Sequence, residues 1–176
     1  SVLKFMSKAQ QTKARIIHQA AELIYLKGYA GSSIADIMRA TGLKKGGIYN
    51  HFKSKDELAL ETFDYAVSLL SQRIWSVVKT KRNAIERLQA LVSSYLIYID
   101  APPLVGGCPI MNTAIETDDT DSPLRDRALE AMNSSRRLIV RIERKGIKKG
   151  QVRSPVEPDT VSNIIFSSLE VSIMMS

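Results

Sequence analysis

The sequence predicts an all-α protein with a small N-terminal unit followed by longer helices. Apolar residues recur at helical spacing over nearly the whole chain, and no segment shows sustained apolar–polar alternation between hairpin turns. Charge is unevenly placed as well. Residues 1–60 hold ten lysines and arginines against four acidic residues, a net charge of +6, while the whole chain carries +7. The first third is therefore expected to meet a polyanion, and a solvated basic surface is the alternative.

Composition excludes several classes of protein. With 176 residues and 44% hydrophobic content, the chain can bury a core, which excludes a disordered tail. Its single cysteine, Cys108, cannot form an intrachain disulfide. The longest apolar stretch, Tyr95–Ile99, falls far short of the roughly 20 residues that span a bilayer, and no signal pattern is present. We therefore expect a cytoplasmic protein with no membrane partner.

Three helices are predicted before residue 54. The first carries its apolar residues on one face and ends at Gly28, a typical residue just beyond a helix C-terminus. Either Ser32 or Ser33 can cap the second helix, and Gly42 supplies the turn that follows it. The third helix is short and turns Ile48 inward.

Capping residues place the next two helices. Ser54 and Glu57 form a capping box, in which the hydroxyl accepts the Glu57 N–H and the Glu57 side chain reaches back. This box opens a long fourth helix, and Asn83 with Glu86 repeats it at the fifth. Pro102-Pro103 ends the fifth helix. The inward face of that helix is predicted to carry Ile85, Leu88, Val92, Tyr95 and Ile99.

Prolines and glycines place the last three helices. A shorter helix is predicted over about Pro109–Glu116. The next covers about Pro123–Lys145, where Gly146 ends it. The last begins at Pro158 and is still running at Ser176.

Between Gly28 and Leu58, 21 residues stand at a distinctive fixed spacing. They are Gly28-Tyr29, Ser32-Ser33-Ile34, Asp36-Ile37, Thr41-Gly42-Leu43, Lys45-Gly46, Ile48-Tyr49, His51-Phe52 and Ser54–Leu58. This stretch, within Thr12–Leu58, resembles the DNA-binding domain of the TetR family of bacterial transcriptional regulators. The run from Gly107 through Glu116, with the acidic linker that follows it, also resembles C-terminal domains of part of that family.

The resemblance implies that the third helix enters the major groove of DNA, with Lys44-Lys45-Gly46-Gly47 as its first turn. Glycine side chains leave room for the backbone to approach a phosphate or a base edge, and the helix N-terminus suits a phosphate. Lys44 is expected to read bases and Lys45 to contact a phosphate or a guanine edge. The expected DNA contacts are Ser32, Lys44, Lys45, Gly46, Gly47, Tyr49, Asn50, His51 and Lys55.

Each of these assignments has a plainer alternative. Tyr49 can be a half-buried core residue, Lys44 and Lys55 solvated charges, and His51 an ordinary surface histidine. Family members usually carry a small residue where Lys44 stands. The extra lysine is expected to strengthen phosphate attraction and to alter the choice of base.

The resemblance also implies two roles for the longer helices. Residues 1–54 form the predicted DNA-binding domain, and residues 55–176 form a domain for effector binding and dimerisation, expected to be C-terminally incomplete because family chains usually continue through one more helix. The expected partners are double-stranded operator DNA, a small-molecule effector and a second copy of the chain. Candidate pocket walls, for which core packing is the alternative, are Phe63, Trp75, Tyr95, Tyr98, Met111 and Met132.

Cys108 supports a separate hypothesis. If Pro109 is the first helical residue, Cys108 occupies the N-cap, where the helix dipole favours the thiolate. Such a thiol can sense oxidants or electrophiles. The alternative is a small residue packed beneath a loop.

The function predicted from these features is a ligand-responsive repressor that binds a pseudo-palindromic operator as a dimer. No cofactor or metal is expected, because Asp118, Asp119 and Asp121 lack further ligands at suitable spacing and more simply form an acidic linker. An enzyme is disfavoured because two histidines and one cysteine, far apart in sequence, form no evident triad. A helical protein-interaction module without DNA binding is the third hypothesis, against which the basic first turn argues.

Overall fold

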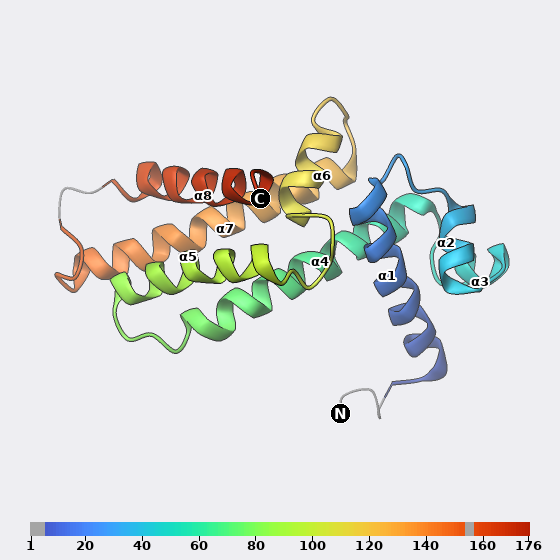
Figure 1. Cartoon of the computed structure of the whole chain (residues 1–176), viewed down its shortest axis with the longest axis horizontal. Helices are drawn as coiled ribbons and strands as arrows, with labels where there is room; N and C mark the ends of the chain where they lie inside the picture. Colours follow the sequence, from blue (N-terminus) through green and yellow to red (C-terminus); the bar gives the residue numbers. More distant parts are fainter. Residues whose placement is uncertain (1–5, 154–156) are drawn as a thin grey trace. The chain divides into compact units, whose positions relative to one another are not determined.

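The computed structural model describes residues 6–153 and 157–176, and within these ranges the regular structure is helical, without strands (Figure 1). The all-α prediction is therefore confirmed. The helices are α1 (Lys8–Lys27), α2 (Ile34–Thr41), α3 (Lys45–Tyr49), α4 (Lys55–Val78), α5 (Ala84–Asp100), α6 (Pro109–Thr117), α7 (Pro123–Lys148) and α8 (Pro158–Met174). No helix of the described ranges is both long and apolar enough to cross a membrane.

Packing divides the chain into two units. Unit 1 comprises Ser1–Val67 and Leu104–Arg125, so it joins α1, α2, α3 and the first half of α4 to α6. Unit 2 comprises Ser68–Pro103 and Asp126–Ser176, with the rest of α4, α5, nearly all of α7, and α8. This grouping differs from a division at residue 54, because α6 packs with the N-terminal helices.

The core of unit 1 joins its first three helices to the start of α4. Its buried members are apolar residues spaced at helical intervals, and Phe52, just after α3, is 2% exposed. The cluster consists of Ile16, Ala20, Ile24, Ile37, Ile48, Phe52 and Leu58. Because it draws on four helices, it fixes the short α3, which is far below the length at which an isolated helix is stable.

The predicted helix caps are present with one difference. Asn83 Oδ1 accepts the Glu86 N–H at 2.8 Å, and Ser54 Oγ accepts the Glu57 N–H at 3.1 Å. Each glutamate, however, reaches one residue further back than predicted, to the N–H of Arg82 or Lys53.

Two predictions about unit 2 are wrong. Gly146 does not end α7, which continues to Lys148. A Cβ at Gly146 would lie 2.5 Å from the Ala84 Cβ and 2.7 Å from Val152 Cγ2, so the missing side chain permits close packing. On α5, Ile85 and Val92 are exposed rather than inward, and Leu91, Ser94 and Tyr98 are among the residues that face the core.

Replacing Gly146 by alanine tests this packing role. Alanine favours a helix over glycine by about 1 kcal/mol, but overpacking a tight contact costs about 1–3 kcal/mol. We expect Gly146→Ala to lower the midpoint of urea unfolding, whereas Gly46→Ala, where a Cβ meets open space among the described residues, should not. An unchanged midpoint for Gly146→Ala would contradict the packing role.

A buried carboxyl makes the stability of unit 2 depend on pH. Glu143 is 1% exposed, and burial together with the Asp159 carboxylate raises its pKa from 4.5 to about 7. The folded state therefore holds the Glu143 proton more tightly than the unfolded chain does. The stability that this proton contributes is expected to be fully present below about pH 4.5 and to be lost as the pH rises through 7.

Glu143→Gln should remove this dependence. The variant should gain stability relative to the natural chain between pH 5 and pH 8, by up to about 3 kcal/mol at the upper end. Urea unfolding at several pH values measures the difference, with Asp121→Asn, at an exposed carboxyl, as the control. Parallel pH profiles for the natural chain and Glu143→Gln would refute the assignment.

Candidate nucleic-acid interface

Helices α2 and α3 form a helix-turn-helix, and a complete capping box stabilises the N-terminus of α2. Ser33, not Ser32, caps α2: its hydroxyl accepts the Asp36 N–H at 3.1 Å, and its own N–H donates to the Asp36 carboxylate at 2.8 Å. The hydroxyl and N–H of Ser33 lower the pKa of Asp36. Gly42 follows α2 in the left-handed conformation, with φ of 69°, and turns the chain toward α3.

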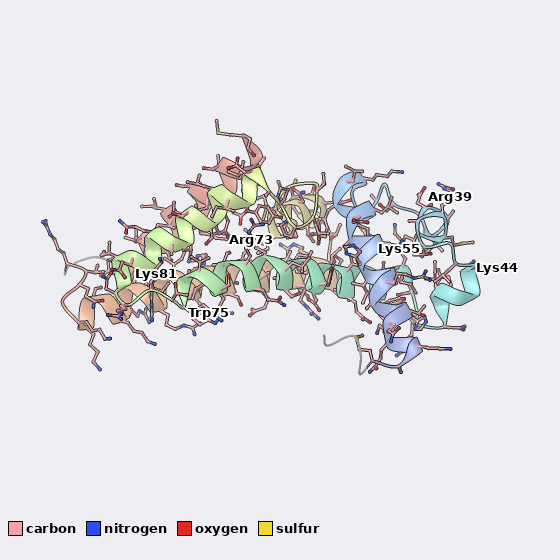
Figure 2. The ribbon with its side chains drawn as sticks, turned by 60° about the horizontal axis from the view of Figure 1, so that its bottom comes forward. Arg39, Lys44, Lys55, Arg73, Trp75 and Lys81 are labelled. Atoms are coloured by element: carbon pink, nitrogen blue, oxygen red, sulfur yellow. The ribbon has the colours of Figure 1, made fainter. Side chains whose placement is uncertain are left out.

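The start of α3 is exposed and cationic. Lys44 occupies the N-cap, and Lys45 begins the helix. Lys44, Lys45 and Gly46 are exposed, whereas Gly47 is half-buried against the Leu43 side chain. Figure 2 shows Lys44 at this end of α3. The backbone is therefore open to a large ligand beside two lysines.

Three further predicted contacts extend this surface. Tyr49 is 38% exposed, and the Lys45 ammonium lies 5.8 Å from the centroid of its ring. Asn50 is exposed, and His51 is half-buried with its ring centroid 6.4 Å from that of Phe52. The structure thus brings seven of the nine predicted DNA contacts together at and just after α3, which we call the α3 surface (Lys44–Gly47 and Tyr49–His51).

The other two predicted contacts, Ser32 and Lys55, are engaged inside unit 1. Ser32 is fully buried, and its hydroxyl donates to the Gly28 carbonyl at 2.7 Å. The Lys55 ammonium donates to the Tyr29 carbonyl at 2.8 Å and lies 4.1 Å above the centroid of the Tyr29 ring. In this structure both residues contact the turn between α1 and α2, and the phosphate clamp expected of them stays a prediction.

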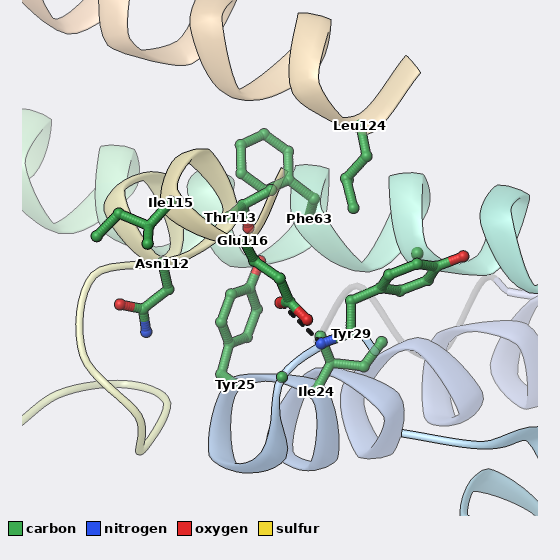
Figure 3. Close-up of a pocket in the computed structure, with 11 residues that line it drawn as sticks. Ile24, Tyr25, Tyr29, Phe63, Asn112, Thr113, Ile115, Glu116 and Leu124 are labelled. Atoms are coloured by element: carbon green, nitrogen blue, oxygen red, sulfur yellow. Dashed lines mark hydrogen bonds between the residues drawn. The ribbon is translucent and has the colours of Figure 1, made fainter. Parts of the chain in front are cut away.

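A carboxylate from α6 also holds this turn, which sequence reasoning missed. Glu116 accepts the N–H of Tyr29 at 2.9 Å, as Figure 3 shows, and it also accepts the N–H of Ala30 at 2.7 Å. Gly28, with φ of 81°, lets the carboxylate approach, since a Cβ there would lie 3.1 Å from Glu116 Oε1. No local sequence signal connects residues that are 86 and 87 positions apart.

Tyr29 connects the turn to α4 as well. Its hydroxyl donates to the Asp56 carboxylate. Burial, then Asp56 and then Glu116, raise the pKa of Tyr29 to about 12. One residue of the turn is therefore bonded to α4 through its hydroxyl and its carbonyl, and to α6 through its N–H.

An open cavity of about 220 Å³ lies beside Glu116 in unit 1, and we call it the Glu116 hollow. Figure 3 shows its walls, which are largely apolar and aromatic. They are Ile24, Tyr25, Gly28, Tyr29, Ala59, Phe63, Asn112, Thr113, Ile115, Glu116 and Leu124. Among the residues predicted to line an effector pocket, Phe63 is a wall of this hollow.

The other predicted pocket residues lie elsewhere. Trp75 is 51% exposed on α4, so it is not an interior wall in this structure (Figure 2). Tyr95 and Tyr98 are buried on α5 in unit 2, which fits the core-packing alternative. Met111 and Met132 are half-buried on α6 and α7.

Cys108 occupies the N-cap of α6, with Pro109 as the first helical residue, as predicted. The residue is 2% exposed. Within the described ranges, the acidic residues that follow α6 belong to no group of three side chains suited to a metal ion.

These features together define a helix-turn-helix protein of the kind that regulates transcription. Residues 16–62 match the family described as "Bacterial regulatory proteins, tetR family", and residues 84–176 match "Tetracyclin repressor-like, C-terminal domain". The chain belongs to the TetR family of bacterial transcriptional regulators.

Individual relatives agree with this assignment. A TetR transcriptional regulator from Chloroflexus aurantiacus is 42% identical in sequence. Its crystal structure matches this chain with a TM-score of 0.92, over 97% of this chain and 86% of that chain. The uncharacterised HTH-type regulator YxaF of Bacillus subtilis is 25% identical over 97% of this chain and 87% of that protein. AibR, solved with isovaleryl coenzyme A and operator DNA, shares the fold at 20% identity, with a TM-score of 0.75 over 93% of this chain and 86% of that chain.

The burial of Cys108 gives a direct test of the thiol-sensor hypothesis. Because the side chain is shielded, the folded protein should react with a maleimide about tenfold or more slowly than free cysteine near pH 7. Mass spectrometry over time, before and after addition of urea, measures both rates. A folded-state rate at or above that of free cysteine would support a sensor instead.

Proposed function

We propose that the chain is a ligand-responsive repressor, which binds a pseudo-palindromic operator as a homodimer and is released by a small-molecule effector. The observation that carries the DNA-binding part is the α3 surface. It combines two exposed lysines with two glycines, so that cations and bare backbone are presented together. This combination suits the major groove, where the backbone of a recognition helix must approach closely.

The residues of the α3 surface divide into two roles in this proposal. Lys44 and Asn50 are the base readers, since lysine pairs with guanine and asparagine with adenine. Lys45, Tyr49 and His51 contact phosphates, which fixes the position of the helix without reading sequence. The Lys45–Tyr49 contact supports this role, because it holds the ammonium and the phenol side by side.

A second copy of the chain is proposed to cover part of unit 2. The last helix exposes apolar side chains at helical spacing: Ile164 is 61% exposed, Val171 47% and Met174 61%. An exposed apolar stripe of this kind favours association between helices. Two copies would present two α3 surfaces about 34 Å apart, one turn of DNA, which matches a pseudo-palindromic site.

A small-molecule effector is proposed because a protein of the same fold, AibR, was solved with both isovaleryl coenzyme A and operator DNA. A ligand that favours one of two conformations of the dimer would shift the spacing of the α3 surfaces and lower DNA affinity.

The DNA-binding proposal is tested by fluorescence anisotropy on the DNA upstream of the protein's own gene. Lys44→Ala should weaken binding by about 1–3 kcal/mol and relax the base preference, and Tyr49→Ala should weaken it without changing the preference. Affinity should also fall steeply with salt. Lys79→Ala, an exposed lysine just after α4, is the matched control. Wild-type affinity in both α3 variants would refute the assignment.

A further inference from the structure

We propose that the Glu116 hollow is a binding site for a compact molecule with an aromatic or aliphatic body and a cationic head. Its occupation would withdraw Glu116 from the turn between α1 and α2. The inference rests on the proposed ligand-responsive function, and it names the chemistry of the ligand and the contact that the ligand disrupts.

The walls of the hollow determine the body of the ligand. Ile24, Phe63 and Leu124 supply aliphatic and aromatic surface, and Tyr25 and Tyr29 add two further rings. A volume of about 220 Å³ accommodates a single-ring molecule rather than a long chain or a nucleotide.

Charge determines the head of the ligand. Among the described residues, the walls of the hollow include the Glu116 carboxylate and no lysine, arginine or histidine. A neighbouring cavity of about 310 Å³ shares Tyr29 and Glu116 with it and adds Asp56, again without a basic wall. The chain as a whole carries a net charge of +7, so the negative charge at these two cavities is opposite in sign to the net charge of the chain. Cationic ligands are attracted here and anionic ones are repelled.

Aromatic rings strengthen this preference. The face of a tyrosine or phenylalanine ring attracts a cation at short range. The Tyr29 ring already does so, with the Lys55 ammonium 4.1 Å from its centroid. A ligand cation in the hollow would find Glu116 together with the rings of Tyr25 and Phe63.

The same carboxylate links the hollow to the DNA-binding helices. Glu116 accepts hydrogen bonds from the N–H groups of Tyr29 and Ala30. Both bonds are exposed to solvent, so an incoming ammonium group can compete for the carboxylate. The α2 helix begins at Ile34, four residues beyond Ala30, so a released turn loosens the support of α2 and α3. By linkage, bound DNA and bound ligand would each weaken the affinity for the other.

Three probes of nearly equal size separate charge from shape: 2-phenylethylamine, 2-phenylethanol and phenylacetate. Calorimetry without DNA should show the amine binding at least about tenfold more tightly than the alcohol, and phenylacetate binding weakest. Glu116→Gln keeps the side-chain shape and should reduce this preference to about twofold or less. Glu130→Gln, an exposed carboxylate on α7, should leave it unchanged.

Two results would overturn the site: an amine that binds no better than the alcohol, or a charge preference that survives in Glu116→Gln. Because these titrations contain no DNA, they remain informative if the operator proposal fails. Adding the amine to the DNA complex then tests the linkage separately, with at least about tenfold weaker DNA binding expected for the natural chain and less than about twofold for Glu116→Gln. An equal loss in both chains would overturn the role of Glu116 in release.

Discussion

The Glu116 carboxylate accepts hydrogen bonds from two backbone N–H groups, and the arrangement of unit 1 depends on this interaction. The side chains of Tyr29 and Ser32 help to hold the turn between α1 and α2, but the N–H groups of Tyr29 and Ala30 also need an acceptor. Glu116 supplies one from α6, at 2.9 Å for Tyr29 and 2.7 Å for Ala30. Hydrogen bonds to a charged acceptor contribute about 1.5–3 kcal/mol each, less where water competes. The contact is therefore strong enough to fix the turn and weak enough to be displaced.

Other contacts with Tyr29 complete this arrangement. Lys55 and Asp56, both in the first turn of α4, bind the Tyr29 carbonyl and hydroxyl, so that one residue joins α4 and α6 to the helix-turn-helix. The hydrophobic core beneath it, built around Ile37, Ile48 and Phe52, fixes α2 and α3 against α1. The helices that carry the α3 surface are thus supported by contacts with residues distant in sequence. These contacts connect α6 to the residues that we propose to contact DNA.

The features that the sequence predicted are those decided within a few residues. The capping pairs Ser54–Glu57 and Asn83–Glu86 each form between residues three positions apart, and in each pair the cap side chain accepts the glutamate N–H as predicted. The core positions Ile37 and Ile48 follow from helical spacing. The α3 surface follows from a short run of lysines and glycines. All of these depend on local geometry, which a single sequence records directly.

The features that the sequence did not predict depend on tertiary packing. Glycine is a residue type that often ends helices, but Gly146 instead permits close packing against Ala84, which is distant in the chain. The hydrogen bonds from Lys55 to the Tyr29 carbonyl and from Ser32 to the Gly28 carbonyl were likewise not evident from the sequence. The prediction for the inward face of α5 is wrong because the small residues Ala90 and Ser94 face the core, whereas Ile85 and Val92 are exposed. Glu116 was unremarkable in sequence because its partners are 86 and 87 residues away.

Amide hydrogen exchange measures the central contact most directly. In Glu116→Gln the amide oxygen can accept one N–H, and the amide nitrogen faces the other without bonding to it. The amide protons of Tyr29 and Ala30 should then exchange about tenfold faster than in the natural chain. The amide protons of Asp36 and Glu57, which donate to the hydroxyls of Ser33 and Ser54, should exchange at unchanged rates. Equal exchange at Tyr29 and Ala30 in the two proteins would contradict the account.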